Sequence, residues 1–414
     1  MKKEHEFEIY GLKYVFPTKP TVVVCLDGSE PEYINFAIKK GLMPNVENMI
    51  EKGEYHIAKS AMPSFTNPNN ISIATGTPPK IHGISGNYYY DPSKCEAIMM
   101  NDVKFLNTKT IFYYYQKLNA KVAIITAKDK LRSLLGADLS FEHDMAVCFS
   151  AEMADRATFT SNGISNASKW LDKPVPCVYS SDLSEFVFAA GEKLLNEFKP
   201  DIMYLSTTDY IQHKYDIGDN NALEFYQMVD KYIGKFLENN ISLIITADHG
   251  MKPKHNKFGK PNIIFLQNIL DHYLKEKCLK VILPITDPYV VHHGALGSFA
   301  TIYFHEELDI EKISNFLKNK QGILEVLNRQ EASSKFELPE DRIGDLTVIS
   351  EENMTFGTSP EDHDLSLLKE PLRSHGGITE QNVPFIINKK INITNTKSLR
   401  NFHAFHYATL ASKI

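Results

Sequence analysis

Four short apolar runs of one design recur through the first 250 residues of the chain. They are rich in β-branched residues, and they cover residues 21–26, 121–126, 201–206 and 241–247. Uninterrupted apolar runs of this kind are typical of strands that are buried on both faces of a parallel sheet. Segments of helical length, such as 184–198 and 221–238, lie between them. This alternation predicts an α/β fold with a mainly parallel central sheet flanked by helices.

The pattern of apolar residues changes after residue 254. Short predicted strands alternate there with amphipathic segments such as 311–318, and the strands cover 280–284, 300–304 and 346–350. A further apolar run at 383–387 returns to the pattern of the first half. We therefore expect a catalytic core that is discontinuous in sequence, formed by 1–254 and 371–414. Residues 255–370 are expected to form an inserted, smaller α+β cap domain.

Polar side chains follow each of the four predicted core strands. Asp27 follows the first, Lys128 and Lys130 follow the second, Asp209 follows the third and Asp248 follows the fourth. In open parallel sheets, ligands bind outside the carboxyl ends of the strands. Since those ends lie at one edge of the sheet, we expect these side chains to meet there.

Carboxylates and imidazoles dominate this predicted edge. The set is Asp27, Asp209, His213, Asp248, His249 and His375. Oxygen and nitrogen ligands of this kind suit zinc, and six such groups with one hydroxyl are enough for two zinc ions. Asp209 and His213 are four residues apart, so one helical turn would direct both toward one metal. With 15 histidines in the chain, chance pairings are common. A metal site is favoured because these residues all follow predicted strands of one sheet.

A second candidate segment is Pro-Ser-Phe-Thr-Asn-Pro-Asn-Asn at 63–70. Pro68 and the residues before it are typical of a helix start, and Gly76 is typical of its end. The N-terminus of a helix offers free N–H groups to a phosphoryl group. Thr66 is then either a helix cap, which is common for threonine, or a nucleophile activated by a metal. From the residues alone both alternatives stay open.

Charge and cysteine usage exclude several classes of protein. The 45 Lys and Arg residues against 51 Asp and Glu give a formal charge of −6, which argues against a general nucleic-acid-binding protein. The cysteines are five, scattered and without a Cys-x-x-Cys pair, so we expect no disulfide framework and no thiolate zinc site. The chain shows no signal-peptide core and no membrane-spanning apolar stretch. These features predict a soluble cytoplasmic protein that works without nucleic acid or membrane.

Taken together, the motifs resemble those of the alkaline phosphatase superfamily, in its nucleotide pyrophosphatase/phosphodiesterase-like branch. The resemblance extends over nearly the whole chain. It rests on Asp27, the MPSFTNPNN and HGISGNYYYD segments, Asp209-x-x-x-His213, Ala-Asp-His-Gly at 247–250 and Ser-His-Gly at 374–376. Within this branch, Ser-Phe-Thr-Asn-Pro-Asn-Asn and Thr-Ala-Lys-Asp-Lys at 126–130 resemble the corresponding segments of the phosphonoacetate hydrolases.

The resemblance implies a role for each residue of the site. One zinc ion would be bound by Asp209, His213 and His375, and a second by Asp27, Thr66, Asp248 and His249. Thr66 would be the nucleophile. Asn87 would contact a phosphoryl oxygen, and Lys128 and Lys130 would hold the carboxylate of the substrate.

The expected substrate is a small anionic phosphonate. Phosphonoacetate carries about three negative charges, which two zinc ions and two lysines can neutralise. We therefore expect a di-zinc hydrolase that cleaves the C–P bond to acetate and phosphate through a phosphothreonine. A metal-dependent phosphodiesterase or nucleotide pyrophosphatase acting on a P–O bond, a manganese-dependent phosphomutase and a non-catalytic anion-binding module are the alternatives. A homodimer is the expected assembly, because two-fold assemblies are common.

Overall fold

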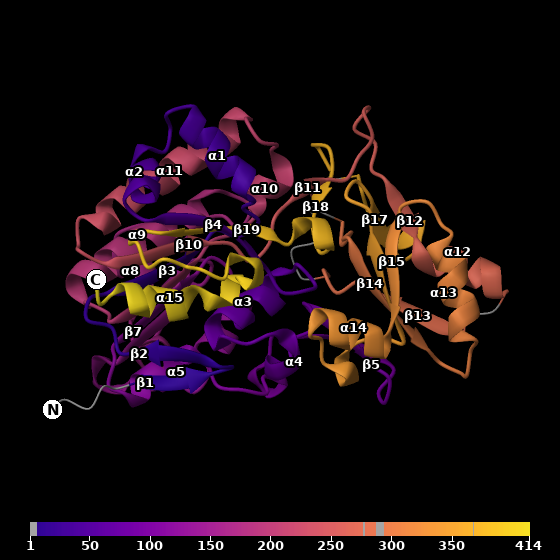
Figure 1. Ribbon diagram of the computed structural model, residues 1–414, viewed down its shortest axis with the longest axis horizontal. Helices are drawn as coiled ribbons and strands as arrows, with labels where there is room; N and C mark the ends of the chain where they lie inside the picture. Colours follow the sequence, from indigo (N-terminus) through magenta and orange to yellow (C-terminus); the bar gives the residue numbers. More distant parts are fainter. Residues whose placement is uncertain (1–5, 276–277, 287–293, 367) are drawn as a thin grey trace.

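The computed structural model describes residues 6–275, 278–286, 294–366 and 368–414. Two lobes lie side by side along the long axis of the molecule (Figure 1). The larger lobe is built around a seven-stranded sheet, and the smaller lobe around a four-stranded sheet.

The sheet of the larger lobe has the strand order β4-β19-β10-β3-β9-β7-β8. From β10 to β8 all neighbours pair in parallel, whereas β19 is antiparallel to both β10 and β4. The strands are β3 (Thr21–Cys25), β4 (Glu54–Lys59), β7 (Val122–Thr126), β8 (Ala146–Ser150), β9 (Ile202–Ser206), β10 (Ser242–Thr246) and β19 (Asn382–Ile387). The predicted fold class is confirmed, and β4 and β8 are additions to the strands that the sequence predicted.

Helices cover both faces of this sheet (Figure 1). Successive residues of a strand point to opposite faces: Val22 and Val24 lie in one apolar cluster, while Val23 and Cys25 lie in the other. The first cluster includes residues of α1 (Pro31–Lys39), α2 (Pro44–Lys52), α8 (Ala167–Leu171), α9 (Asp182–Glu197) and α11 (Asn220–Leu237). The second includes residues of α3 (Thr66–Thr75), α5 (Ile111–Lys117), α6 (Asp129–Leu135) and α15 (Ala404–Ala411). Burial on both faces explains why the central strands are continuously apolar.

The smaller lobe is an antiparallel sheet with its own apolar core. Its strands follow the order β13-β14-β16-β15, and a parallel pair, β12 and β17, lies beside them. The strands are β12 (Ile263–Phe265), β13 (Leu279–Ile282), β14 (Phe299–Phe304), β15 (Ile323–Asn328), β16 (Leu346–Ser350) and β17 (Thr355–Gly357). The helices are α12 (Leu266–Leu274), α13 (Ile310–Lys318) and α14 (Arg329–Phe336). This is the α+β architecture expected of the cap.

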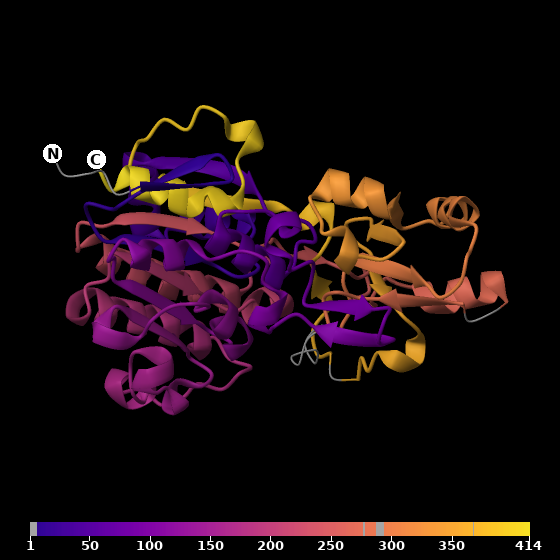
Figure 2. The same ribbon diagram turned by 90° about the horizontal axis from the view of Figure 1, so that it is seen from below.

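The chain crosses between the lobes at two strands that pair with each other. These are β11 (Lys252–Pro253) and β18 (Arg373–Ser374), which are antiparallel. A hairpin of β5 (Tyr88–Asp91) and β6 (Glu96–Met99) also reaches from the larger lobe along the smaller one (Figure 2). The boundaries at 254/255 and 370/371 stay a prediction. Within the described residues, no helix combines the length and the apolar composition that a membrane crossing requires.

A buried ion pair lies beside this crossing. The Nζ atom of Lys254 is 2.9 Å from Oε1 of Glu380, and both side chains are fully buried. Lys254 also donates to the carbonyl of Glu352, while Oε2 of Glu380 accepts the N–H of Gly377 at 2.8 Å. The pair therefore ties β11 to the loop that follows β18.

We expect Lys254→Met to lower the free energy of unfolding by about 3–5 kcal/mol, because it leaves the carboxylate of Glu380 buried without its partner. Equilibrium urea unfolding, followed by circular dichroism, measures this change. Lys104→Met is the matched control, since Lys104 pairs with Asp102 at the exposed surface, and its unfolding curve should coincide with that of the wild type. Equal unfolding curves for the two variants would contradict the interpretation.

Candidate metal centre

Loops at the carboxyl ends of the central strands place the predicted ligands together. Six of these side chains, all buried, form two groups. In each group, the atoms able to bind a metal lie within 4.8 Å of one another. The groups are Asp209, His213 and His375, and Asp27, Asp248 and His249.

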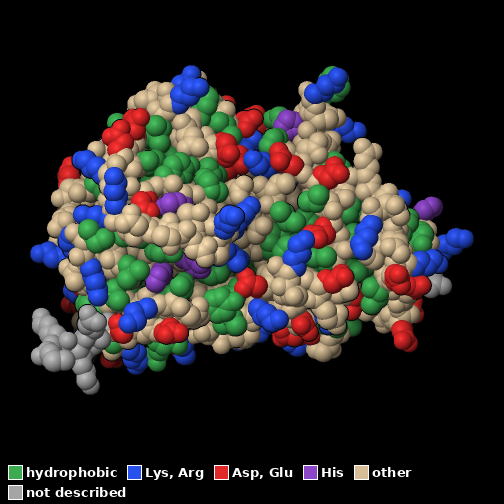
Figure 3. Space-filling model, in the orientation of Figure 1, with side chains coloured by type: hydrophobic (Ala, Val, Ile, Leu, Met, Phe, Trp, Pro, Cys, Tyr) green, Lys and Arg blue, Asp and Glu red, His purple; other side chains and the backbone are tan. Residues whose placement is uncertain are grey.

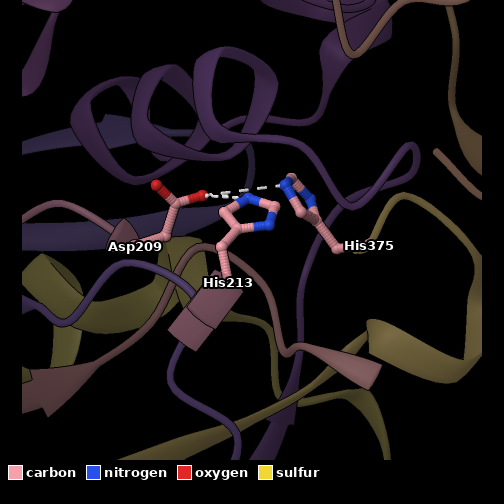
Figure 4. Close-up of side chains that lie close together, drawn as sticks. All are labelled: Asp209, His213 and His375. Carbon is pink, nitrogen blue, oxygen red and sulfur yellow. Dashed lines mark ion pairs between the residues drawn. The ribbon is translucent and has the colours of Figure 1, made fainter. Parts of the chain in front are cut away.

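The first group combines one turn of helix with the loop after β18. Asp209 is the N-cap residue of α10 (Tyr210–Lys214), and His213 follows one turn later. Nε2 of His213 lies 3.0 Å from Oδ2 of Asp209, and Nε2 of His375 lies 3.8 Å from the same oxygen. Figure 4 shows both imidazoles turned toward this carboxylate. The spacing of four residues therefore places the side chains of Asp209 and His213 next to each other.

The second group gathers around His249 in the bend after β10. Its Nε2 atom is 3.2 Å from Oδ1 of Asp27, 3.7 Å from Oδ2 of Asp248 and 3.4 Å from Oγ1 of Thr66. The ring of His249 stacks on that of His375 with centroids 3.6 Å apart and an angle of 6°. The two groups therefore adjoin and form one centre.

Backbone carbonyls hold the far side of all three imidazoles. Each Nδ1 atom lies 2.7–2.9 Å from a main-chain oxygen, those of Arg373, Gly250 and Ser64 for His213, His249 and His375 respectively. A carbonyl only accepts hydrogen bonds, so Nδ1 carries a proton in each ring. Nε2 is then the atom left to bind a metal, as in many metal-binding histidines.

The electrostatics of the centre call for added positive charge. Burial, reinforced by the carboxylates of Asp209 and Asp248, raises the pKa of Asp27 well above its usual range. Burial alone would lower the pKa of His249, but the surrounding carboxylates raise it to about 9. Burial, together with the charges of His249 and His213, lowers the pKa of His375 well below its usual value. Crowded carboxylates among imidazoles whose Nε2 atoms point toward them fit divalent cations such as zinc.

Gly28 allows the loop after β3 to turn tightly against α10. Its φ is +70°, and a Cβ atom at this position would lie 2.9 Å from Cβ of Asp209. Its N–H donates to Oδ1 of Asp248 at 3.2 Å. A side chain at position 28 would therefore push the two ligand groups apart.

Thr66 is the first residue of α3, and its hydroxyl faces the centre. The N-cap residue is Phe65, whose side chain makes no capping bond, so the interpretation of Thr66 as a cap is wrong. The helix begins at Thr66, two residues before Pro68, within the segment that the sequence indicated as a helix start. Gly76 ends it in the left-handed conformation, as predicted.

The other predicted residues lie around this helix. Nζ of Lys128 is 3.6 Å from Oδ1 of Asp209, and Lys128 is the buried N-cap residue of α6. Lys130 lies in the first turn of α6 and is half-buried. Oδ1 of Asn87 accepts the N–H of Asn67 at 3.2 Å, and Nδ2 of Asn87 donates to the carbonyl of Ile285 at 3.2 Å. Asn87 thus connects the start of α3 to the smaller lobe.

Asn70 is a residue of the site whose role the sequence did not indicate. Its Nδ2 donates to Oδ2 of Asp248 and to the carbonyl of Thr66, both at 3.0 Å. Its Oδ1 accepts the hydroxyls of Tyr204 and Ser206, both at 2.8 Å. The available signal was its position four residues after Thr66, on the same face of the helix.

Arg373 is a second such residue. Its guanidinium donates to the carbonyls of Gln212 and Met251 and to the carboxylate of Asp216, at 2.9, 3.3 and 2.7 Å. Its own carbonyl holds His213, so one residue links α10, the loop after β10 and β18. The available signal was its place directly before the Ser-His-Gly segment.

Comparison with known families gives a match over most of the chain. Residues 21–378 match the model of the type I phosphodiesterase/nucleotide pyrophosphatase family. A human ectonucleotide pyrophosphatase/phosphodiesterase family member 1 is 23% identical over 57% of this chain and 24% of its own length. Human bis(5'-adenosyl)-triphosphatase ENPP4 is 24% identical over 61% of this chain and 51% of its own. The chain thus spans only a quarter to a half of these curated relatives.

Solved structures extend the comparison to the full fold. Phosphonoacetate hydrolase from Sinorhizobium meliloti 1021 is 55% identical to this chain and has a TM-score of 0.96. The match covers 99% of this chain and 100% of that chain, and the two solved structures contain phosphonoformate and phosphonoacetate. Murine ectonucleotide pyrophosphatase/phosphodiesterase 5 shares the fold, with 16% identity, 96% and 95% coverage and a TM-score of 0.64. The chain therefore belongs to the type I phosphodiesterase/nucleotide pyrophosphatase family, within the alkaline phosphatase superfamily, and is similar over its whole length to phosphonoacetate hydrolase.

Proposed function

We propose that this protein is a phosphonoacetate hydrolase, which cleaves the C–P bond of phosphonoacetate to give acetate and orthophosphate. The observation that carries the proposal is the buried centre in which two Asp/His groups adjoin Thr66 and Lys128. Similarity at 55% identity to a hydrolase bound to phosphonoacetate supports the substrate. A small anionic phosphonate is the ligand class that this relative binds.

We infer that the centre holds two zinc ions. Asp209, His213 and His375 would bind one of them, and the second would be bound by Asp27, Thr66, Asp248 and His249. When bound, zinc would lower the pKa of the Thr66 hydroxyl and neutralise charge on the phosphonate. The support for this choice of metal is the donor set of carboxylate oxygens and imidazole nitrogens.

Thr66 supplies the nucleophile in this mechanism. The hydroxyl gives up its proton as Oγ1 attacks phosphorus, and the P–C bond breaks as the O–P bond forms. The electron pair of the broken bond moves onto carbon and into the adjoining carboxylate as an enolate, which takes a proton to become acetate. Water then hydrolyses the phosphothreonine, which restores the Thr66 hydroxyl and releases orthophosphate.

Lys128 and Lys130 bind the carboxylate of the substrate. An ammonium group beside that carboxylate stabilises the enolate most, because negative charge grows there as the C–P bond breaks. Lys128 lies beside Asp209, and Lys130 follows two residues later, in the first turn of the same helix. Asn87 contacts a phosphoryl oxygen with the second N–H of its amide, since the first is used by Ile285.

The second candidate activity is cleavage of a phosphate diester or pyrophosphate at the same centre. The match to the phosphodiesterase/nucleotide pyrophosphatase family favours it, because it uses the same ligands and Thr66 on a P–O bond. Such a substrate need not carry a carboxylate beside the reacting phosphorus. The two activities therefore differ in their need for Lys128 and Lys130.

We further propose that the protein works in the cytoplasm as a homodimer, without nucleic acid or membrane. The support is an acidic net charge, five scattered cysteines and no disulfide among the described residues. Two-fold assemblies are the commonest form of soluble oligomer.

The direct test supplies purified protein with phosphonoacetate and zinc and measures acetate and phosphate together. We expect equal amounts of both products. Thr66→Ala should lower kcat by at least about a thousandfold, because no other hydroxyl replaces the nucleophile. Thr66→Ser keeps a hydroxyl and should retain measurable turnover. Absence of phosphate from the wild type with zinc present would sink the proposal.

Lys128→Ala separates the two candidate activities. We expect it to lower kcat/KM for phosphonoacetate by about 10–100-fold, the usual effect of losing a charged hydrogen bond. Turnover of an aryl phosphate diester, measured by release of the phenol, should change far less. An equal loss with both substrates would instead assign Lys128 to the metal centre as a whole.

Asp27→Asn tests the charge balance of the centre. In chelator, the variant should melt roughly 2–4 °C above wild type, because it removes a buried carboxylate that two others repel. The raised pKa means that protonated Asp27 stabilises the fold at low pH, and that this contribution disappears as the pH rises through the folded-state pKa. The gap between the variant and wild type should therefore widen with pH.

Added zinc should reverse this order, since it stabilises the wild type by binding the native state and the variant much less. Glu51→Gln, at an exposed position of α2, is the control and should melt as wild type does in both conditions. A variant that gains as much from zinc as the wild type would show that Asp27 is not a ligand.

A further inference from the structure

A cavity lies at the junction of the two lobes, and none of the side chains of the metal centre lines it. Its volume is about 500 Å³, within the range of small-molecule sites. Lys59 at the end of β4 and Arg400 line it from the larger lobe, and Lys335 and Phe336 of α14 line it from the smaller lobe. A ligand in this cavity would touch both lobes.

Positive charge dominates the lining. Lys59, Lys335, Lys397 and Arg400 face one carboxylate, that of Glu337. Arg400 pairs with Glu337 at 2.8 Å, and Lys335 pairs with a carboxylate outside the cavity at 2.5 Å. Across the described ranges, neither Lys59 nor Lys397 forms an ion pair. The cavity therefore keeps a local excess of positive charge on a chain whose net charge is −6.

The face of the molecule in Figure 3 carries charged side chains of both signs. On the face in Figure 3, acidic and basic side chains are interspersed over both lobes. Opposite charges placed together offset each other's field, whereas like charges lining a concave surface add up.

Two polar groups of the lining lack compensation. Nε of Arg400 is buried and has no hydrogen-bond acceptor in the described structure. Partial burial lowers the pKa of Lys59. An anionic oxygen in the cavity would pair with the ammonium group of Lys59.

The remaining wall combines an apolar part, formed by Met62, Phe336 and Ile378, with the polar side chains of Gln381 and Ser398. The apolar part lies close in sequence to the segments of the proposed site. Met62 lies four residues before Thr66, and Ile378 lies three residues after His375. Inorganic ions would leave this apolar wall uncovered, whereas an organic ligand would cover it.

We propose that this cavity binds a small organic polyanion, with an apolar body against Met62, Phe336 and Ile378 and at least two negative charges among the basic side chains. The proposal is independent of the hydrolytic activity, because the cavity shares no residue with the metal centre.

Naphthalene disulfonate is a suitable probe, since it is aromatic, carries two charges, and its sulfonates are poor zinc ligands. We expect saturable, one-to-one binding to the full chain in isothermal titration calorimetry, weakened by added salt. Naphthalene monosulfonate should bind several-fold more weakly. The double variant Lys59→Gln/Lys397→Gln should weaken binding of the disulfonate by about tenfold.

The matched control is Lys39→Gln/Lys312→Gln, which removes two exposed lysines far from this lining and leaves the same net charge. Its affinity for the probe should equal that of the wild type. Equal affinities of the two double variants, or the absence of saturable binding to wild type, would overturn the proposal. Phosphonoacetate turnover should be the same in both variants, which separates this test from that of the metal centre.

Discussion

The buried carboxylates at the carboxyl ends of the central strands are the constraint on which the larger lobe depends. Asp27, Asp209 and Asp248 approach one another in a buried region, where like charges repel strongly. The surrounding structure is arranged to hold them in place. Gly28 brings two of the ligand loops together, and backbone carbonyls fix the three imidazoles in one tautomer. Cations bound at this centre would offset the repulsion, so the fold and the proposed chemistry have the same requirement.

Helix α3 links this centre to the reaction. The side-chain nitrogen of Asn70 donates to the carboxylate of Asp248 and to the carbonyl of Thr66. Its side-chain oxygen accepts the hydroxyls of two residues of β9. One side chain therefore connects the proposed nucleophile to a proposed metal ligand. The small residues and amides of this helix are buried along its whole length, which is unusual for so polar a segment. Hydrogen bonds to neighbouring elements compensate for that burial.

Sequence patterns predicted the centre of the fold better than its edges. The strands around β3 were predicted because both of their faces are buried and their sequences are continuously apolar. Edge strand β4 has exposed and polar positions and did not give that signal. The other edge strand, β8, is as long and as buried as its neighbours, and its run Ala-Val-Cys-Phe was missed. The ligand residues could be predicted from their place after strands, but their division into two groups came from family resemblance. Thr66 could not be separated from a cap, because Phe65, the true N-cap residue, carries no recognisable capping side chain. Asn70 and Arg373 contact residues far from them in the sequence, and those contacts are formed only in the tertiary structure.

The position of β19 has a consequence for synthesis of the protein on the ribosome. This strand lies between β4 and β10, yet it is made after the entire smaller lobe. Until residues 382–387 leave the ribosome, β10 is an open edge and β4 has no partner in the sheet. His375 arrives only shortly before. A nascent chain of 370 residues can therefore contain a folded smaller lobe but neither a closed main sheet nor a complete centre, and its exposed strand edges are sites at which chaperones would be needed.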